Sequence, residues 1–258
     1  MLEIHDLSIE IGGKKIVDSV SFRVEEGDRF MIVGPNGSGK TTLLRGLMQM
    51  VPSRGTVRLN GRDVRKLSPR QLAREAGVLI QKHNLEFAHT VHEVVSLGRY
   101  SCSRKLLPGL SGVDREKIEE ALAITGIEGL RNRSVLSLSG GELQRVFLAQ
   151  LFAQDPGLLI LDEPANHLDL QYQKMLFEMI RDWSKEKGKA VMAVVHDLNL
   201  ALTYGTRALM MNEGTVFSQG TCEEVLKNGN LEQVYHMDVA QWMRMLLSRW
   251  KEEDSGHE

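Results

Sequence analysis

One short segment near the N-terminus, residues 34–41, constrains the fold of this chain more than any other. It reads GPNGSGKT and fits the pattern G-x-x-x-x-G-K-[ST], in which a glycine-rich loop wraps around a phosphate group. Residues 30–33 before it form an apolar run of strand length, and residues 42–48 after it place their apolar side chains on one face of a helix. Because strand, loop and helix agree, we favour a phosphate-binding loop over a plain glycine-rich turn with a surface lysine.

The residues of this loop indicate how an anion would be held. Glycines let backbone N–H groups close around a phosphate without clashes from Cβ atoms, and the N-terminus of the following helix adds a positive dipole end. In such loops the lysine, here Lys40, reaches the β- and γ-phosphates, and the next hydroxyl, here Thr41, holds Mg²⁺. The sequence therefore predicts ATP and Mg²⁺ as cofactors.

Composition narrows the class of protein. A chain of 258 residues is long enough for one large domain or two small ones, and its net charge of -2 gives no electrostatic case for nucleic acid as a partner. Two distant cysteines, Cys102 and Cys222, form no disulfide framework. The N-terminus lacks the pattern of a signal peptide, and no apolar run approaches the roughly 20 residues that span a bilayer. We expect a cytosolic protein whose membrane role, if any, depends on a partner.

Strand-like and helix-like patterns alternate along the chain. Strands are expected within a hairpin at residues 4–24 and at residues 55–61, 77–80, 158–161, 191–195, 208–211 and 215–217, the last two paired across residues 212–214. Helical patterns cover residues 170–183 and 198–204, and Asp114 and Ser139 are each expected to cap a helix. This alternation indicates an α/β fold with a mostly parallel sheet.

The change from strand-like to helical patterns along the sequence also suggests how the chain is divided. Residues from about 85 to 155 are mainly helical in pattern and interrupt the strands, as an inserted helical subdomain would. We expect a single domain over residues 1–258. Its α/β core, with an antiparallel part at its N-terminus, would comprise residues 1–84 and 156–226, and residues 227–258 would form a C-terminal extension.

Two carboxylates follow the apolar run at residues 158–161. Asp162 and Glu163 would lie at the carboxyl edge of the sheet, where ligands bind in open α/β folds. Because successive side chains of a strand point in opposite directions, one could face Mg²⁺ and the other an attacking water. The alternative is an acidic strand end facing solvent, which the nearby phosphate loop makes less favourable.

The segment Leu138-Ser139-Gly140-Gly141-Glu142 stands before this acidic strand and opens a helix. Its order and spacing between the phosphate loop and the carboxylates are highly specific. The combination resembles the ATP-binding cassette (ABC) family, in particular the ATPase subunit of a membrane transporter. The resemblance runs from about residue 2 to residue 226 and implies a P-loop ATPase core.

The resemblance implies a role for each matching residue. ATP would be bound by the phosphate loop, which comprises Gly34, Pro35, Asn36, Gly37, Ser38, Gly39, Lys40, Thr41 and Thr42. Magnesium would be held by Thr41, Gln81 and Asp162. The catalytic residues would be Lys40, Glu163 and His196, with Glu163 as the general base. Residues 166–169 resemble the loop that faces the opposite subunit. The residues that would reach the nucleotide of that subunit are Ser139, Gly140, Gly141, Glu142 and Asp169.

A dimer follows from the two anion sites. Ser139 and the glycines after it offer a hydroxyl and N–H groups at a helix N-terminus, which is a second site for phosphate. One chain cannot bring both sites onto one phosphate if they lie on opposite sides of the domain, whereas two chains related by a twofold axis can. The expected partners are therefore a second copy of this chain, two polytopic permease subunits and, indirectly, a substrate-binding protein.

One position departs from the family pattern. The family usually places an aromatic residue near the first hairpin to stack on adenine, and the matching residue here is Ile11. Because ring pairing contributes about 0.5–1.5 kcal/mol beyond burial, its loss should weaken nucleotide binding by about tenfold at most. Ile11 can still pack on the base, and the choice between ATP and GTP stays open.

Three segments bear on the type of transporter. Residues 90–100, 196–201 and 220–226 resemble importers of iron chelates, haem and cobalamin. Importers of zinc or manganese are one alternative. A soluble ABC ATPase, such as one in iron–sulfur cluster assembly, is another. An importer subunit would lie at the cytoplasmic face of the cell membrane as a peripheral protein.

Overall fold

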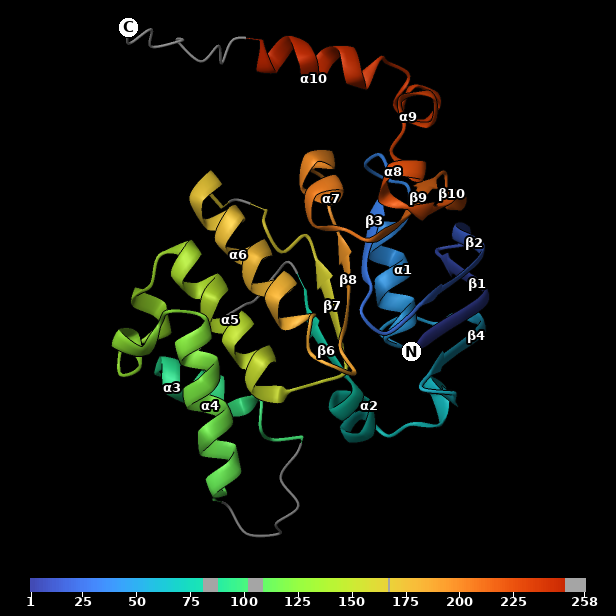
Figure 1. Ribbon diagram of the computed structural model, residues 1–258. Coiled ribbons are helices and arrows are strands. Elements are labelled where there is room, and N and C mark those ends of the chain that lie inside the picture. Colours follow the sequence, from blue (N-terminus) through green and yellow to red (C-terminus); the bar gives the residue numbers. More distant parts are fainter. Residues whose placement is uncertain (81–87, 102–108, 167, 249–258) are drawn as a thin grey trace, which may run out of the picture.

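The chain forms two β-sheets with helices between and around them. The computed structural model describes residues 1–80, 88–101, 109–166 and 168–248 (Figure 1). The larger sheet has the strand order β10-β9-β3-β8-β7-β6, and all neighbouring strands are parallel except β9 and β10. Its strands are β3 Arg29–Val33, β6 Ala76–Leu79, β7 Leu158–Asp162, β8 Ala190–Val194, β9 Arg207–Asn212 and β10 Thr215–Thr221.

The smaller sheet is antiparallel and lies at the N-terminal side of the molecule. Its strand order is β2-β1-β4-β5, and its strands are β1 Leu2–Ile11, β2 Lys14–Val24, β4 Arg54–Leu59 and β5 Arg62–Asp63. The hairpin β1–β2 confirms the strand pattern expected over residues 4–24. Helix α1, Lys40–Leu47, buries Leu43, Leu44 and Leu47 in a core shared by both sheets.

The buried strands of the larger sheet contribute side chains to two separate hydrophobic cores, because successive side chains alternate between the two faces of the sheet. In β7, Leu158 and Ile160 join the core around α1, while Leu159 and Leu161 join the core on the other face. That second core also contains side chains of α5, Gly140–Gln154, and α6, Leu170–Trp183. Every residue of β7 and β8 is buried, which is typical of parallel strands covered on both faces.

A helical part follows β6 and precedes β7 in the chain. It contains α3, Val91–Leu97, and α4, Gly112–Ile124, which pack with α5. The prediction that Asp114 caps α4 is wrong, because the N-cap is Ser111, whose hydroxyl accepts from the Asp114 backbone N–H. Asp114 lies in the first turn and completes a capping box, because its Oδ2 accepts from the Ser111 N–H at 2.9 Å. Its Oδ1 accepts from Arg99 Nε at 2.9 Å, and both side chains are buried.

Several further helices were not expected from the sequence. They are α2 Pro69–Glu75, α8 Cys222–Val225, α9 Asn228–Tyr235, α10 Val239–Leu247 and the 3₁₀ turns Val64–Lys66, Glu128–Leu130 and Val135–Ser137. Helix α7, Leu198–Tyr204, was expected and is confirmed. Within the described ranges, no helix combines the length and apolar character that crossing a bilayer requires.

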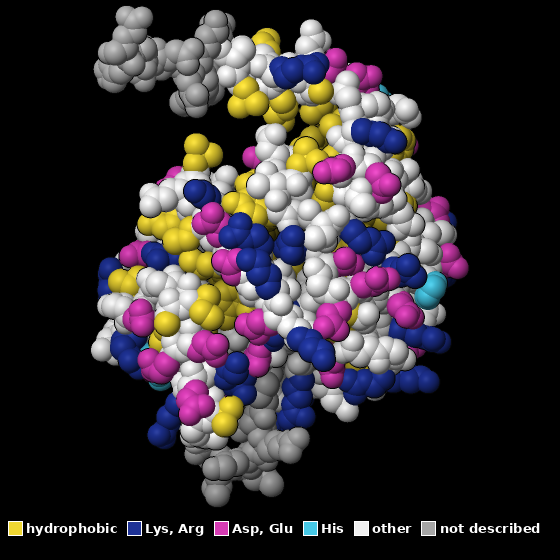
Figure 2. Space-filling model, in the orientation of Figure 1, with side chains coloured by type: hydrophobic (Ala, Val, Ile, Leu, Met, Phe, Trp, Pro, Cys, Tyr) yellow, Lys and Arg dark blue, Asp and Glu magenta, His cyan; other side chains and the backbone are white. Residues whose placement is uncertain are grey.

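The surface mixes both signs of charge. Figure 2 shows Lys, Arg, Asp and Glu side chains interspersed over one face of the molecule, and hydrophobic side chains gathered under α10, where a hollow separates this helix from the body. Trp242, Met245 and Leu246 of α10 are between 45% and 49% exposed. The fold as a whole confirms the predicted α/β class, with a mostly parallel sheet, an antiparallel N-terminal part and a helical subdomain.

Candidate functional site

The candidate site lies where parallel strands end side by side. Lys40 follows β3, Glu163 follows β7 and His196 follows β8, and these strands are neighbours in the order β3-β8-β7. Because the carboxyl ends of parallel strands share one edge of a sheet, the topology gathers the three side chains there. Three segments that are far apart in sequence therefore converge at this edge.

The phosphate loop joins β3 to α1 as expected, and its glycines are required by its geometry. Gly34, Gly37 and Gly39 have φ angles of +142°, +81° and +100°, a region that favours glycine. A Cβ atom on Gly34 would lie 2.2 Å from the Met211 carbonyl oxygen, and one on Gly39 would lie 2.8 Å from that of Ile16. Glycine at these positions therefore lets the loop adopt this backbone conformation without strain, and at Gly34 and Gly39 without a steric clash.

Lys40 lies across this loop. Its Nζ donates to the carbonyl oxygens of Gly34 and Pro35, both at 2.8 Å, and the residue is only 5% exposed. Burial lowers the pKa of the Lys40 ammonium, and the negative charges of Glu163 and Asp162 oppose that change. A buried cation held by neutral carbonyls would gain a stronger partner from a phosphate.

Two further groups fit a nucleotide with a divalent cation. The Ser38 hydroxyl is buried and has no hydrogen-bond partner among the described residues, although buried polar atoms are normally paired. The Thr41 hydroxyl donates to Asp162 Oδ1 at 3.1 Å, and burial raises the pKa of the Asp162 carboxyl against the opposing effect of this bond. A hydroxyl and a carboxylate beside a phosphate site are ligands that Mg²⁺ accepts. Gln81, the third expected ligand, lies outside the described residues.

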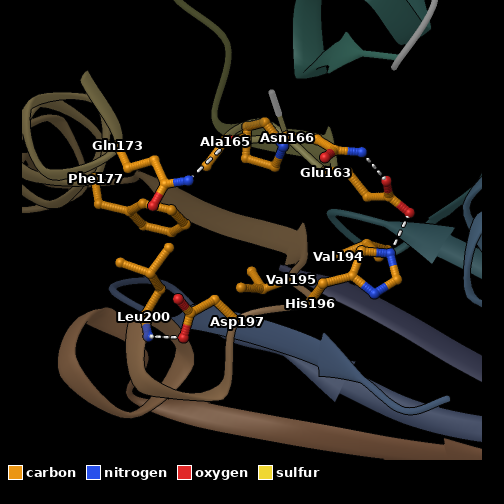
Figure 3. Close-up of a pocket in the computed structure, with 11 residues that line it drawn as sticks. Glu163, Ala165, Asn166, Gln173, Phe177, Val194, Val195, His196, Asp197 and Leu200 are labelled. Carbon is orange, nitrogen blue, oxygen red and sulfur yellow. Dashed lines mark hydrogen bonds and ion pairs between the residues drawn. The ribbon is translucent and has the colours of Figure 1, made fainter. Parts of the chain in front are cut away.

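Glu163 is held from two sides (Figure 3). Its Oε1 lies 2.5 Å from His196 Nε2, and its Oε2 accepts from Asn166 Nδ2 at 2.9 Å. The expectation that the pleat of the strand separates the two carboxylates is wrong, because β7 ends at Asp162 and Glu163 has a left-handed φ of +53°. The turn, rather than the strand, orients the Glu163 side chain. The sequence analysis gave Asn166 no role of its own. The available signal was weak, since Asn is simply a common residue in turns.

The Ser139 segment forms a helix start that faces outward. Ser139 is the N-cap of α5, its Oγ accepts from the Glu142 N–H, and Glu142 Oε2 accepts from the Ser139 N–H at 2.8 Å. These bonds make Glu142 part of a capping box and lower the pKa of its carboxyl. Ser139 and Gly140 are exposed, whereas Gly141 packs against Tyr172. Asp169 is the N-cap of α6, and its Oδ1 accepts from the Tyr172 N–H at 2.9 Å.

The structure thus separates the predicted residues into two groups. Lys40, Thr41, Asp162, Glu163 and His196 come together through the contacts above. The second group consists of Ser139, Gly140, Gly141, Glu142 and Asp169. Within the described ranges, no hydrogen bond or ion pair links this group to the phosphate loop. This separation is what a site completed by a second chain requires.

Ile11 ends β1 and is 49% exposed. If this residue packs on the base, Ile11→Tyr should lower the dissociation constant for ATP by up to about tenfold, because a ring adds stacking to burial. Titration with ATP followed by calorimetry measures the effect. Ile124→Tyr is a matched control, since Ile124 is similarly exposed at the end of α4. An unchanged dissociation constant in Ile11→Tyr would place the base elsewhere.

Comparison with known proteins gives consistent results. A family model described as ABC transporter matches residues 17–166. The hemin import ATP-binding protein HmuV of Mesorhizobium japonicum is 38% identical, covering 91% of each chain. The iron(3+)-hydroxamate import ATP-binding protein FhuC of Bacillus subtilis is 35% identical, covering 90% of this chain and 87% of its own. The chain spans only 54% of a third relative, the uncharacterized ABC transporter ATP-binding protein YvrA of B. subtilis, which is 38% identical over 92% of this chain.

A solved structure resembles the whole fold. The dimeric bacterial ABC transporter cassette MJ0796 is 26% identical and superposes with a TM-score of 0.75, covering 86% of this chain and 99% of its own. The arrangement of sheets and helices described above is therefore that of an ATP-binding cassette.

Proposed function

Because this chain belongs to the ABC transporter family as an ATP-binding subunit, we propose that it hydrolyses ATP to drive the import of an iron chelate such as haem or a hydroxamate siderophore. Relatives named for hemin and for hydroxamate import match it over nearly its full length. The observation that carries the proposal for hydrolysis is the junction of Lys40, Thr41 and Asp162 with the Glu163–His196 pair at one sheet edge.

In the proposed reaction, the phosphate loop and Lys40 bind the triphosphate through N–H groups and the buried ammonium. Thr41 and Asp162, with Gln81, would hold Mg²⁺, which supplies charge neutralisation when it is bound. Glu163 orients or deprotonates the attacking water, and His196 holds the Glu163 carboxylate and faces the γ-phosphate. Lys40 disperses the charge that develops on the phosphoryl oxygens.

The second anion site suggests the working assembly. Ser139 and the N–H groups after it lie at the exposed N-terminus of α5, and a fifteen-residue helix offers a full dipole end to an anion. We propose a homodimer in which Ser139, Gly140, Gly141, Glu142 and Asp169 of one subunit face the nucleotide of the other. The dimeric form of the MJ0796 cassette supports this arrangement.

The assembly would work at a membrane through partners. Two polytopic permease subunits would form the channel, a substrate-binding protein would deliver the cargo, and this chain would lie at the cytoplasmic face. We also propose that residues 1–258 act as one ATPase domain, with residues 1–84 and 156–226 as the core, residues of about 85–155 as the helical subdomain and residues 227–258 as an extension.

An uptake assay tests the cargo. In cells that lack this chain, the uptake of labelled haem, ferric hydroxamate and zinc is measured after complementation with the parent chain or with Lys40→Ala. We expect only the parent chain to restore the uptake of an iron chelate, because Lys40→Ala removes the phosphate-binding ammonium. If the parent chain restores only the uptake of zinc, the zinc or manganese alternative is favoured. Unchanged uptake of every cargo, with no polytopic protein co-purifying, would favour a soluble ABC ATPase.

A further inference from the structure

Asn166 contacts Glu163 through both its side chain and its backbone. Its Nδ2 donates to Glu163 Oε2 at 2.9 Å, and its backbone N–H donates to the Glu163 carbonyl oxygen at 3.1 Å. Figure 3 shows the amide and the His196 ring approaching the carboxylate from different sides. The two oxygens of this carboxylate therefore have different partners, and one of these partners is a residue for which the family resemblance assigns no chemistry.

The surroundings of Glu163 make this amide important for its orientation. The Glu163 side chain is 14% exposed and His196 is 41% exposed, so the histidine has room to move while the carboxylate has little. Among the described residues, Lys40 of α1 and Asp162 at the end of β7 are charged groups whose fields interact with Glu163. Lys40 attracts the carboxylate and Asp162 repels it. A neutral donor on Oε2 fixes the side chain without adding charge to this balance.

Pro164 and Leu168, which lie on either side of Asn166, are each held by a side chain of a neighbouring helix. The Gln173 side chain of α6 donates to the Leu168 carbonyl oxygen at 3.0 Å, and the Gln144 side chain of α5 donates to that of Pro164 at 2.9 Å. Glu163 begins this loop with a left-handed φ and its N–H donates to the Val194 carbonyl oxygen at 3.2 Å. Asn166 thus lies between two anchored residues and is bonded through its own N–H to Glu163, which lets its amide define where Oε2 lies.

We propose that Asn166 is a positioning residue for hydrolysis, which holds the Glu163 carboxylate so that its other oxygen is presented to His196 and to the reacting water. The proposal rests on the function proposed above for Glu163. A hydrogen bond to a charged group is typically strong enough that its loss changes an equilibrium about tenfold to a hundredfold. A misplaced catalytic group costs rate of a similar size.

Two substitutions separate positioning from a role in folding. Asn166→Ala removes the amide, and Asn166→Asp keeps its shape and its backbone bond but replaces the donor with a carboxylate. We expect both variants to lower kcat by about tenfold to a hundredfold, with Asp at least as severe as Ala because like charges repel. KM for ATP and the thermal unfolding midpoint should stay near the parent values. Asn60→Asp is the control, since Asn60 Nδ2 also donates to a glutamate, Glu75 Oε2 at 2.6 Å, on an exposed turn.

A double-mutant cycle with Glu163→Gln completes the test. If Asn166 acts through Glu163, Asn166→Ala should cause much less than its single-variant loss of kcat in the Glu163→Gln background. A full additional loss in that background would overturn the proposal, as would a parent kcat in Asn166→Asp. A parent kcat in Glu163→Gln itself would instead refute the proposed role of Glu163, and the positioning role with it. The two failures are therefore distinguishable.

Discussion

Replacement of Glu163 by Gln should lower the turnover of ATP by about 10²–10⁴-fold and leave ATP binding close to that of the parent protein. The amide has nearly the same size as the carboxylate and can still accept a hydrogen bond on one oxygen from His196 or Asn166, which now contact the two carboxylate oxygens. It cannot take a proton from water. The binding groups of the phosphate loop, Lys40 above all, are unchanged. Binding and hydrolysis should therefore separate.

The measurement is steady-state phosphate release combined with light scattering in the presence of ATP and Mg²⁺. The slow variant should accumulate as a dimer, because ATP is expected to hold two subunits together until it is hydrolysed. Glu119→Gln is the control for removal of a carboxylate, since Glu119 forms an exposed ion pair with Arg131 in the helical part. Phosphate release at the parent rate in Glu163→Gln would mean that another group activates the water.

Much of the fold could be predicted because its main signals are local. The runs at residues 158–161 and 191–195 were readable as buried strands, and Ser139 was readable as a helix cap. Helix α2 was not predicted, because none of its residues is buried and no apolar stripe marks it in the sequence. Ser111 was missed as a cap because Asp114, three residues later, is an equally good capping type. The two residues bond reciprocally, and only the backbone decides between them: Ser111 is extended, with ψ of 170°, whereas Asp114 lies within α4.

The candidate site was predictable to a different extent. The phosphate loop is contiguous and carries its own signature, whereas the Thr41–Asp162 contact joins residues that are 121 positions apart. The motifs placed both near Mg²⁺, the family resemblance singled out Asp162, and the sheet order β3-β8-β7 explains why the two residues meet. The contact between Asn166 and Glu163 depends on the left-handed φ of Glu163. That φ is unusual for a residue with a Cβ atom, so no rule of local propensity predicts it.

The second large effect is expected from Ser139→Asp. Aspartate is as good an N-cap as serine, so α5 should keep its start. The new carboxylate loses the bond that Ser139 Oγ donates to Glu142 Oε2 at 2.9 Å and repels Glu142, so the thermal unfolding midpoint should fall slightly. The substitution places a negative charge at the exposed helix end that is proposed to face the γ-phosphate of the other subunit. We expect dimerisation with ATP to be lost and hydrolysis to fall by at least about 10²-fold, the usual cost of removing one donor to a developing charge. Sedimentation with ATP and phosphate release measure the two effects.

Thr221→Asp provides the matched control, because Thr221 caps α8 with a capping box whose other member is also a glutamate, Glu224, and Thr221 is exposed. That variant should hydrolyse ATP at the parent rate. Mixing then tests whether Ser139 acts across subunits. A dimer of one Ser139→Asp chain and one Lys40→Ala chain contains one nucleotide site with both residues intact and one with neither. The mixture should therefore recover hydrolysis above the sum of the separate variants. If it recovers none, Ser139 acts within its own chain, and the exposed start of α5 needs a different explanation.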